Sequence, residues 1–123
     1  PDVNLAMVDV RDTARAHILA AFNDNAKGRY IISESSYKLI DIGKYLRKTF
    51  GDKYPTPKFI APKFIVWLFS PLLGVKRIFI RKNVGYDFYF DNQKSIDELG
   101  MKYTKVNKSA SEFFQQFIDH NLI

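Results

Sequence analysis

The stretch Leu5-Ala-Met-Val-Asp-Val-Arg-Asp-Thr-Ala-Arg-Ala-His17 changes from strand-like to helix-like at Asp9. Its first four residues form an uninterrupted apolar run, which predicts a short buried strand at Leu5–Val8. Asp9 is a residue type that caps helices, and Asp12 would place a second carboxylate in the first turn, as in a capping box. Apolar residues at helical spacing then predict a helix that runs to about Asn23.

A second strand and a second helix follow in the same order. Arg29–Ser33 is rich in β-forming residues and predicts a strand. Ser36 is placed to cap a helix that runs to Phe50, and Gly51 is placed to end it. The order strand, helix, strand, helix favours a parallel sheet with a right-handed crossover.

The remainder of the chain is predicted to be mainly helical. Three of the five prolines lie within residues 54–62, which predicts an extended loop there. The other expected elements are a short helix from Pro62 or Lys63 to Phe69, a helical piece after Pro71, a strand at Asp87–Phe90, a helix capped by Asp91 and ended by Gly100, and a last helix from Asn107 or Ser109.

Length and composition narrow the class of protein. The chain has 123 residues, of which 46% are hydrophobic and 26% charged, so we expect one folded domain with a modest core. It has no cysteine, which excludes a disulfide scaffold, a thiolate metal site and a cysteine nucleophile. Its two histidines cannot build a three-histidine zinc site, and no metal site is expected. No apolar run reaches the roughly 18 residues of a membrane span, and we expect a cytoplasmic protein.

The positive charge is concentrated in the middle of the chain. The formal net charge is +6, and residues 41–82 hold ten bases against two acids. Such a region could attract nucleic acid, anionic lipid or a phosphorylated ligand, although lysines more often solvate helix faces. Because no RNA-binding or DNA-binding signature accompanies these bases, we expect no nucleic acid and no membrane partner. A stand-alone basic module that binds nucleic acid or a membrane surface remains the alternative of another class.

Three segments together resemble one enzyme family. Val8–His17 is similar to the V-D-V-R-D-x-A-x-A-H segment of extended short-chain dehydrogenases/reductases, and Gly28–Ile32 is similar to the G-R-Y strand that follows it there. Phe90–Gly100 resembles the family's F-D-x-x-K-x-x-x-E-L-G segment. The resemblance covers nearly the whole chain but only the C-terminal part of such an enzyme, in the group of dihydroflavonol-4-reductase-like, NAD-dependent epimerases/dehydratases.

The resemblance implies a fold and an activity. The expected fold is α/β, with the last strands and helices of a Rossmann-type sheet in residues 1–51 and a small, mostly helical substrate domain in residues 52–123. The implied function is the C-terminal fragment of an NAD(P)-dependent oxidoreductase that reduces a carbonyl compound. NAD or NADP would be bound by the full-length enzyme and not by this fragment, whose first residue is not methionine. A nucleotide-sugar epimerase or dehydratase is the alternative, although Tyr86 stands where that group carries an acid.

The groups that would bind the cofactor and move protons are missing from the sequence. Its six glycines are too far apart to form the glycine-rich turn of a dinucleotide fold. The family's catalytic pair is Tyr-x-x-x-Lys on a helix, and only Tyr54–Lys58 has that spacing. Two prolines between these residues forbid a helical turn. We therefore expect a fragment that is inactive alone, with no catalytic and no cofactor-binding residue. Its unpaired sheet edge favours a homo-oligomer.

The candidate substrate-binding residues surround the proline-rich loop. Phe59, Phe64 and Trp67 belong to an apolar cluster, in a region that helps to cover the substrate pocket in the family. An apolar wall suits a hydrophobic carbonyl substrate, although an ordinary core gives the same pattern. Arg77 and Arg81 are candidate contacts for an anionic group of the substrate.

Other titratable residues have simpler explanations. Asp9 and Asp12 could form a carboxylate pair for acid/base catalysis, but helix capping is the expected role. His17 lies on the predicted first helix, where a packing or hydrogen-bonding role is expected. His120 lies near a helix C-terminus and has no evident catalytic partner.

Overall fold

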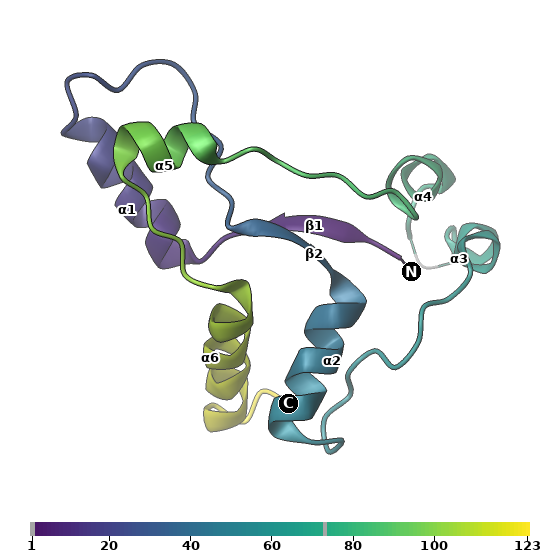
Figure 1. Ribbon diagram of the computed structural model, residues 1–123. Coiled ribbons are helices and arrows are strands. Elements are labelled where there is room, and N and C mark those ends of the chain that lie inside the picture. The colour runs from purple at the N-terminus through teal and green to yellow at the C-terminus, as the bar shows by residue number, and fades with distance from the viewer. Residues whose placement is uncertain (1, 73) are drawn as a thin grey trace. The chain divides into compact units, whose positions relative to one another are not determined.

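The computed structural model describes residues 2–72 and 74–123 and confirms the α/β class, with helices that predominate over a small sheet (Figure 1). The sheet of the described residues has two strands, β1 and β2. The elements are β1 (Asn4–Met7), α1 (Val10–Ala21), β2 (Ser35–Lys38), α2 (Leu39–Phe50), α3 (Lys63–Phe69), α4 (Arg77–Asn83), α5 (Gln93–Leu99) and α6 (Val106–Asp119).

The chain forms two compact units, and each is built from separate stretches of sequence. The first unit contains the chain up to Leu5, Tyr37–Phe88 and Ile123, and the second contains Ala6–Ser36 and Tyr89–Leu122. The boundary therefore passes through the middle of both strands. The division at residue 51 that the family resemblance implies stays a prediction.

The two strands run antiparallel, so the expected parallel crossover is wrong. In the second unit the Glu34 N–H donates to the Met7 carbonyl at 2.8 Å, and in the first unit the Leu39 N–H donates to the Val3 carbonyl at 3.1 Å. The loop after α1 returns the chain to the end of β1 that it left, and β2 then runs back beside β1 (Figure 1). The homo-oligomer expected from an open sheet edge remains a prediction.

The second strand lies further along the chain than predicted. Arg29–Ser33 makes no strand in the structure, because Tyr30 and Ile32 pack against the core of the second unit instead. The Ser33 carbonyl accepts a hydrogen bond from the Asn92 side-chain amide at 2.7 Å, so this carbonyl has a partner without pairing in a sheet. The strand β2 begins only at Ser35.

The start of α2 also differs from the prediction. Ser36 belongs to β2 and does not cap the helix, which begins at Leu39 after Lys38. The Leu39 N–H is satisfied by the backbone of Val3 rather than by a capping side chain. The predicted end is confirmed, because Gly51 follows the last helical residue with a positive φ of 81°.

Helix ends in the second unit were predicted more closely. Asp9 caps α1, and its carboxylate accepts the Arg11 N–H at 2.8 Å. Asn92 precedes α5, while the predicted cap Asp91 accepts the Gln93 N–H at 2.8 Å. The last helix, α6, begins at Val106, one residue before Asn107, which is the earlier of the two predicted starts. The predicted strand at 87–90 is wrong, because the structure assigns no strand to these residues.

The core of the second unit lies between α1 and α5. Ala16, Leu99 and Met101 are its buried residues. The half-buried apolar residues packed against them are Leu19, Ala20, Ala26, Tyr30, Ile32 and Tyr103. This packing fixes the direction in which α1 leaves β1, and so positions the residues at the start of α1. Within the described residues, no helix has the combination of length and apolar character that crossing a bilayer requires.

The left-handed backbone at the end of α5 favours glycine at position 100, and the effect of replacing this glycine can be predicted. It adopts the left-handed conformation with φ 66°, and its N–H donates to the Ile96 carbonyl at 3.0 Å. A Cβ atom there would meet no atom within 4 Å, so only backbone strain opposes substitution. We expect Gly100→Ala to lower the free energy of unfolding by about 1 kcal/mol. Urea unfolding measures the change, with the exposed Lys102→Ala as a control that should leave stability unchanged; equal stabilities would contradict the prediction.

Candidate functional site

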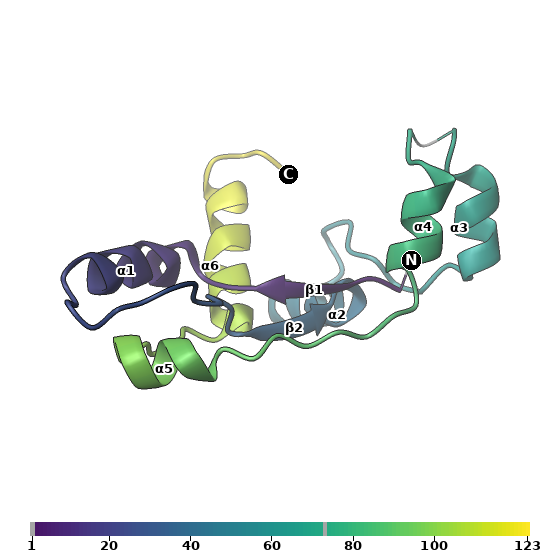
Figure 2. The same cartoon turned by 90° about the horizontal axis from the view of Figure 1, so that it is seen from above.

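The α3–α4 hairpin carries four of the five residues predicted to contact the substrate. Phe64 and Trp67 lie on α3, Arg77 and Arg81 lie on α4, and Phe59 lies in the loop before α3. The two helices lie side by side in both views of the ribbon (Figures 1 and 2). This candidate wall belongs entirely to the first unit.

The local sequence explains how the hairpin forms. Pro62 precedes the first helical residue with φ −54°, a value that its ring fixes in advance. Ser70 follows α3 and is buried, with its hydroxyl donating to the Trp67 carbonyl at 2.9 Å. The Val75 N–H donates to the Ser70 carbonyl at 2.8 Å and closes the turn toward α4. The turn thus brings Arg77 of α4 to the Trp67 ring of α3.

One pair of the predicted residues is in direct contact. The guanidinium carbon of Arg77 lies 4.5 Å from the centroid of the Trp67 ring, which is a cation–π contact. Lys63 is placed similarly, because its Nζ lies 4.4 Å from the centroid of the Tyr86 ring and donates to the Arg81 carbonyl at 3.2 Å. The hairpin therefore presents positive charge beside flat apolar rings, which suits a ligand that has both an aromatic and an anionic part.

The structure does not bring all five predicted residues into one pocket. Phe59 is 80% exposed and Phe64 is 68% exposed, so neither side chain is enclosed. Trp67 is 41% exposed. Within the described part of the chain, the candidate residues form an open surface rather than an enclosed site.

A cavity that the sequence did not predict lies in the second unit. Its volume is about 670 Å³, and it lies between the end of β1, the start of α1 and one side of α6. Apolar side chains dominate its lining: Met7, Val8, Val10, Val106, Ala110 and Phe113. Its polar edge is formed by Asp9, Arg11, Ser109, Glu112 and Gln116. A cavity of this size and character fits a small apolar molecule or an apolar segment of protein.

The polar edge of the cavity is a closed network of charged groups. The Asp9 carboxylate accepts the Arg11 Nε at 2.8 Å and the Arg11 Nη2 at 2.6 Å, and it also accepts the Ser109 hydroxyl. Arg11 Nη2 in turn donates to Glu112 at 2.6 Å. Asp9 is 4% exposed, so this carboxylate is a buried charge with all its partners supplied by the protein.

Hydrogen bonding fixes the protonation of this network. The hydrogen bonds from Arg11 and Ser109 hold the pKa of Asp9 well below its ordinary value, against the opposing effect of burial. The same pairing with Asp9 and Glu112 raises the pKa of Arg11 further above its ordinary value. Asp9 therefore stays ionised at neutral pH and serves as a structural anion, which confirms the capping role expected for it and excludes a role as general acid.

Asp12 has a role that differs from the one predicted. It is completely buried, and its Oδ2 accepts the Thr104 N–H at 2.6 Å instead of capping its own helix. Arg15 Nη1 lies 3.7 Å from the other carboxylate oxygen. Asp12 thus joins α1 to the segment before α6, and this long-range contact could not be read from the local spacing.

The remaining candidates for catalysis do not form a catalytic site in the structure. Nδ1 of His17 lies 2.8 Å from the Thr13 carbonyl oxygen, which confirms the hydrogen-bonding role expected for this histidine. Tyr54 and Lys58 lie outside any helix, as their prolines predicted, and Lys58 Nζ is 3.9 Å from the Asp52 carboxylate. No cluster of three acidic or histidine side chains suitable for a metal ion occurs among the described residues.

Comparison with known proteins gives three curated relatives with the same description, and no family model matches the chain. Cinnamoyl-CoA reductase 1 of Oryza sativa subsp. japonica is 29% identical over 112 residues, which cover 91% of this chain and 28% of the relative. Cinnamoyl-CoA reductase 1 of Petunia hybrida is 32% identical over 107 residues, covering 87% of this chain and 26% of the relative. The protein of the same name from Arabidopsis thaliana is 30% identical over 104 residues, which cover 85% of this chain and 25% of the relative. The chain thus spans about a quarter of the length of the curated relatives it matches.

Proposed function

The chain resembles the C-terminal portion of an extended short-chain dehydrogenase/reductase, and on this premise we propose that it is the substrate-side part of an NAD(P)-dependent reductase acting on a carbonyl compound. The observation that carries the proposal is similarity to three reductases over 85–91% of the chain. Their name refers to a cinnamoyl thioester, whose acyl group is aromatic. An aromatic or otherwise apolar carbonyl compound is therefore the substrate class we propose.

The cofactor is proposed to bind to a part of the enzyme that this chain does not contain. A dinucleotide needs closely spaced glycines that let backbone N–H groups approach its pyrophosphate. The glycines of this chain stand at positions 28, 43, 51, 74, 85 and 100, so the residues present do not fit such a cradle. We assign no step of the reaction to the cofactor on these residues.

The α3–α4 hairpin is proposed to form one wall of the substrate site. Trp67 and Phe64 offer flat apolar surface, and Arg77 lies against the Trp67 ring, where it can reach an anionic group of a ligand stacked on that ring. Such residues bind and orient the substrate, and they neither donate nor accept protons in the reaction. Arg81 is proposed as a second anion contact on the same helix as Arg77, and Phe59 as an apolar contact from the loop before α3.

The test is the activity of the full-length enzyme that contains this chain. We expect oxidation of NADPH or NADH in the presence of an aromatic aldehyde or an aromatic acyl thioester. Trp67→Ala should raise KM about tenfold while kcat changes little, because the wall binds substrate and transition state alike. Phe22→Ala is the matched control, since Phe22 is an exposed aromatic residue in the other unit.

Two results would contradict the proposal. The first is turnover of a nucleotide sugar without turnover of any aromatic carbonyl compound, which would favour an epimerase or dehydratase. The second is an equal effect of Trp67→Ala and Phe22→Ala on KM, which would remove the hairpin from the substrate site while leaving the reductase activity in place.

A further inference from the structure

We propose that the tip of the α3–α4 hairpin docks on the surface of an anionic lipid bilayer. The hairpin tip is defined as Leu68, Phe69, Leu72 and Lys76, which end α3 and lead into α4. The proposal is independent of the proposed reductase activity, because the hairpin tip contains none of the five residues assigned to the substrate wall.

The first argument is the exposure of large apolar side chains at the hairpin tip. Leu72 is 85% exposed, and Leu68 and Phe69 are each 52% exposed. Adjacent apolar side chains in such numbers are uncommon on a soluble surface and mark a site of interaction. Leu68 and Phe69 end α3 and Leu72 follows it, so the three exposed side chains lie close together in the sequence.

The second argument is that a substrate on the proposed wall would leave this surface uncovered. Residues two positions apart on a helix are separated by about 200° around its axis. Phe69 therefore points to the side of α3 opposite Trp67, and Ile65 has the same relation to Trp67. A single small molecule that contacts Trp67 cannot cover both sides of the helix.

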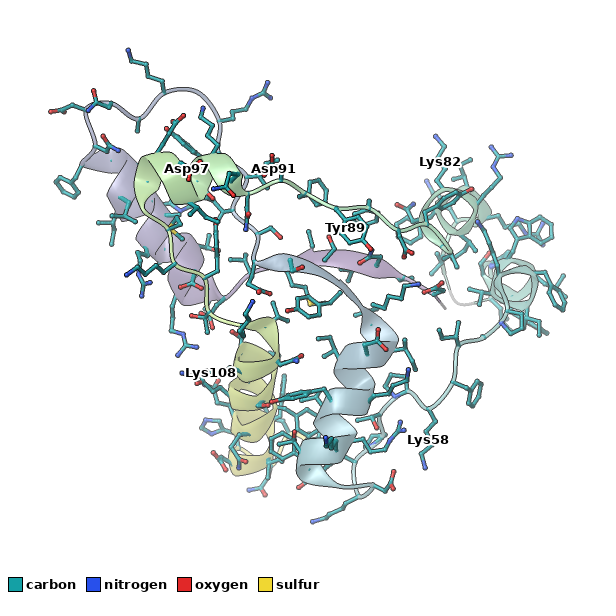
Figure 3. The ribbon with its side chains drawn as sticks, viewed as in Figure 1. Lys58, Lys82, Tyr89, Asp91, Asp97 and Lys108 are labelled. Carbon is teal, nitrogen blue, oxygen red and sulfur yellow. The ribbon has the colours of Figure 1, made fainter. Side chains whose placement is uncertain are left out.

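The third argument is charge. From Lys53 to Tyr86 the sequence contains no acid and seven bases. They are Lys53, Lys58, Lys63, Lys76, Arg77, Arg81 and Lys82. Lys58 and Lys82 both point outward from the ribbon (Figure 3). Cations that flank exposed Trp, Phe and Leu side chains are the combination that binds the headgroup region of anionic membranes.

The charge beside the hairpin tip favours an anionic bilayer over an uncharged apolar partner. The residues that line the cavity of the second unit all lie outside the hairpin. The hairpin tip itself is an exposed apolar turn, which can enter a lipid surface. This inference replaces the sequence-based expectation of no membrane partner with the alternative stated beside it, a module that binds a membrane surface.

The test is sedimentation of the chain with vesicles of phosphatidylcholine alone and of phosphatidylcholine mixed with phosphatidylglycerol. We expect binding to the anionic vesicles, weak or no binding to the neutral ones, and loss of binding at high salt. Leu72→Asp should weaken binding at least about tenfold, since it places a repelled charge where apolar surface must be buried. Lys76→Glu combined with Lys82→Glu should remove the preference for anionic vesicles.

The matched control is the pair Lys102→Glu and Lys108→Glu, which makes the same change of net charge at exposed lysines of the other unit. It should bind at least about tenfold more tightly than the hairpin pair. Circular dichroism and urea unfolding check that each variant is folded, and Leu72→Ser is a milder second variant should Leu72→Asp unfold. Equal effects of the two lysine pairs, unchanged binding of both Leu72 variants, or absence of vesicle binding with self-association instead, would each overturn the proposal.

Discussion

Asp9→Asn is expected to lower the free energy of unfolding at neutral pH by about 2–4 kcal/mol. The asparagine can still accept the Arg11 N–H and cap α1, so the loss comes from the missing charge. Without the carboxylate, the two side-chain hydrogen bonds from Arg11 and the bond from Ser109 lose their charged acceptor in a buried position. Urea unfolding at neutral pH measures the difference from the unsubstituted chain.

The same variant should have a different dependence on pH. The pKa of Asp9 lies well below its ordinary value of 3.8 in the folded chain, chiefly through the hydrogen bonds from Arg11 and Ser109. The folded state therefore holds fewer protons on this group than the unfolded state, and the stability it contributes is complete above about pH 5 and falls as pH drops below about 4. We expect the difference in free energy of unfolding between the unsubstituted chain and Asp9→Asn to become smaller over that acid range.

Asp24→Asn is the control for this comparison, because Asp24 is an exposed carboxylate in a loop of the same unit. It should leave the stability nearly unchanged at every pH. A gap between Asp9→Asn and the unsubstituted chain that stays constant from neutral pH to pH 3 would show that the charge of Asp9 is not what stabilises the fold.

Gly43→Ala should destabilise the first unit even though alanine is the better helix former. A Cβ atom at this buried position of α2 would lie 2.7 Å from Cγ and 3.0 Å from Cδ of Pro57. Alanine gains about 1 kcal/mol of helix propensity, whereas overpacking costs about 1–3 kcal/mol. The proline ring is rigid and its carbonyl is held by Arg47 at 2.7 Å, so the contact is hard to relieve. We expect a net loss of up to about 2 kcal/mol.

A double-mutant cycle isolates that contact. Pro57→Ala removes both ring atoms that the new Cβ would meet, so Gly43→Ala should be neutral or stabilising in a chain that already carries Pro57→Ala. Lys44→Ala, at an exposed position of the same helix, controls for changes in helix propensity. If Gly43→Ala costs the same in both backgrounds, the proline contact is not the cause.

Prediction from the sequence succeeded for helices whose end groups form hydrogen bonds with residues close by in the chain. Asp9 and Gly100 mark helix ends through contacts within a few residues, and both were identified from sequence. The start of α2 was predicted wrongly because the partner of the Leu39 N–H is the Val3 carbonyl, 36 residues away. The strand expected at Arg29–Ser33 failed for a related reason, since β-forming residues there pack on a helical core while the pairing begins two residues later.

The candidate site was likewise predicted where its contacts are close in sequence and missed where they are distant. Trp67 and Arg77 are ten residues apart on adjacent helices, and their contact follows from the turn between them, so grouping them from sequence succeeded. The cavity of the second unit was missed because its polar edge joins Asp9 to Ser109, exactly 100 positions later. The sequence around Ser109 predicts only a possible helix start, and nothing in its neighbours indicates the distant carboxylate.

The boundary between the two units crosses both strands. This arrangement has a consequence for biosynthesis. Each unit needs an early segment and a late one, since Val3 pairs with Val84 and Asp9 binds Ser109. A ribosome that has released only the first half of the chain has therefore completed neither unit. Apolar residues such as those of β1 stay unpaired until their partners have been synthesised. Folding of the nascent chain therefore depends on late, long-range contacts, and chaperones can bind the exposed residues until these contacts form.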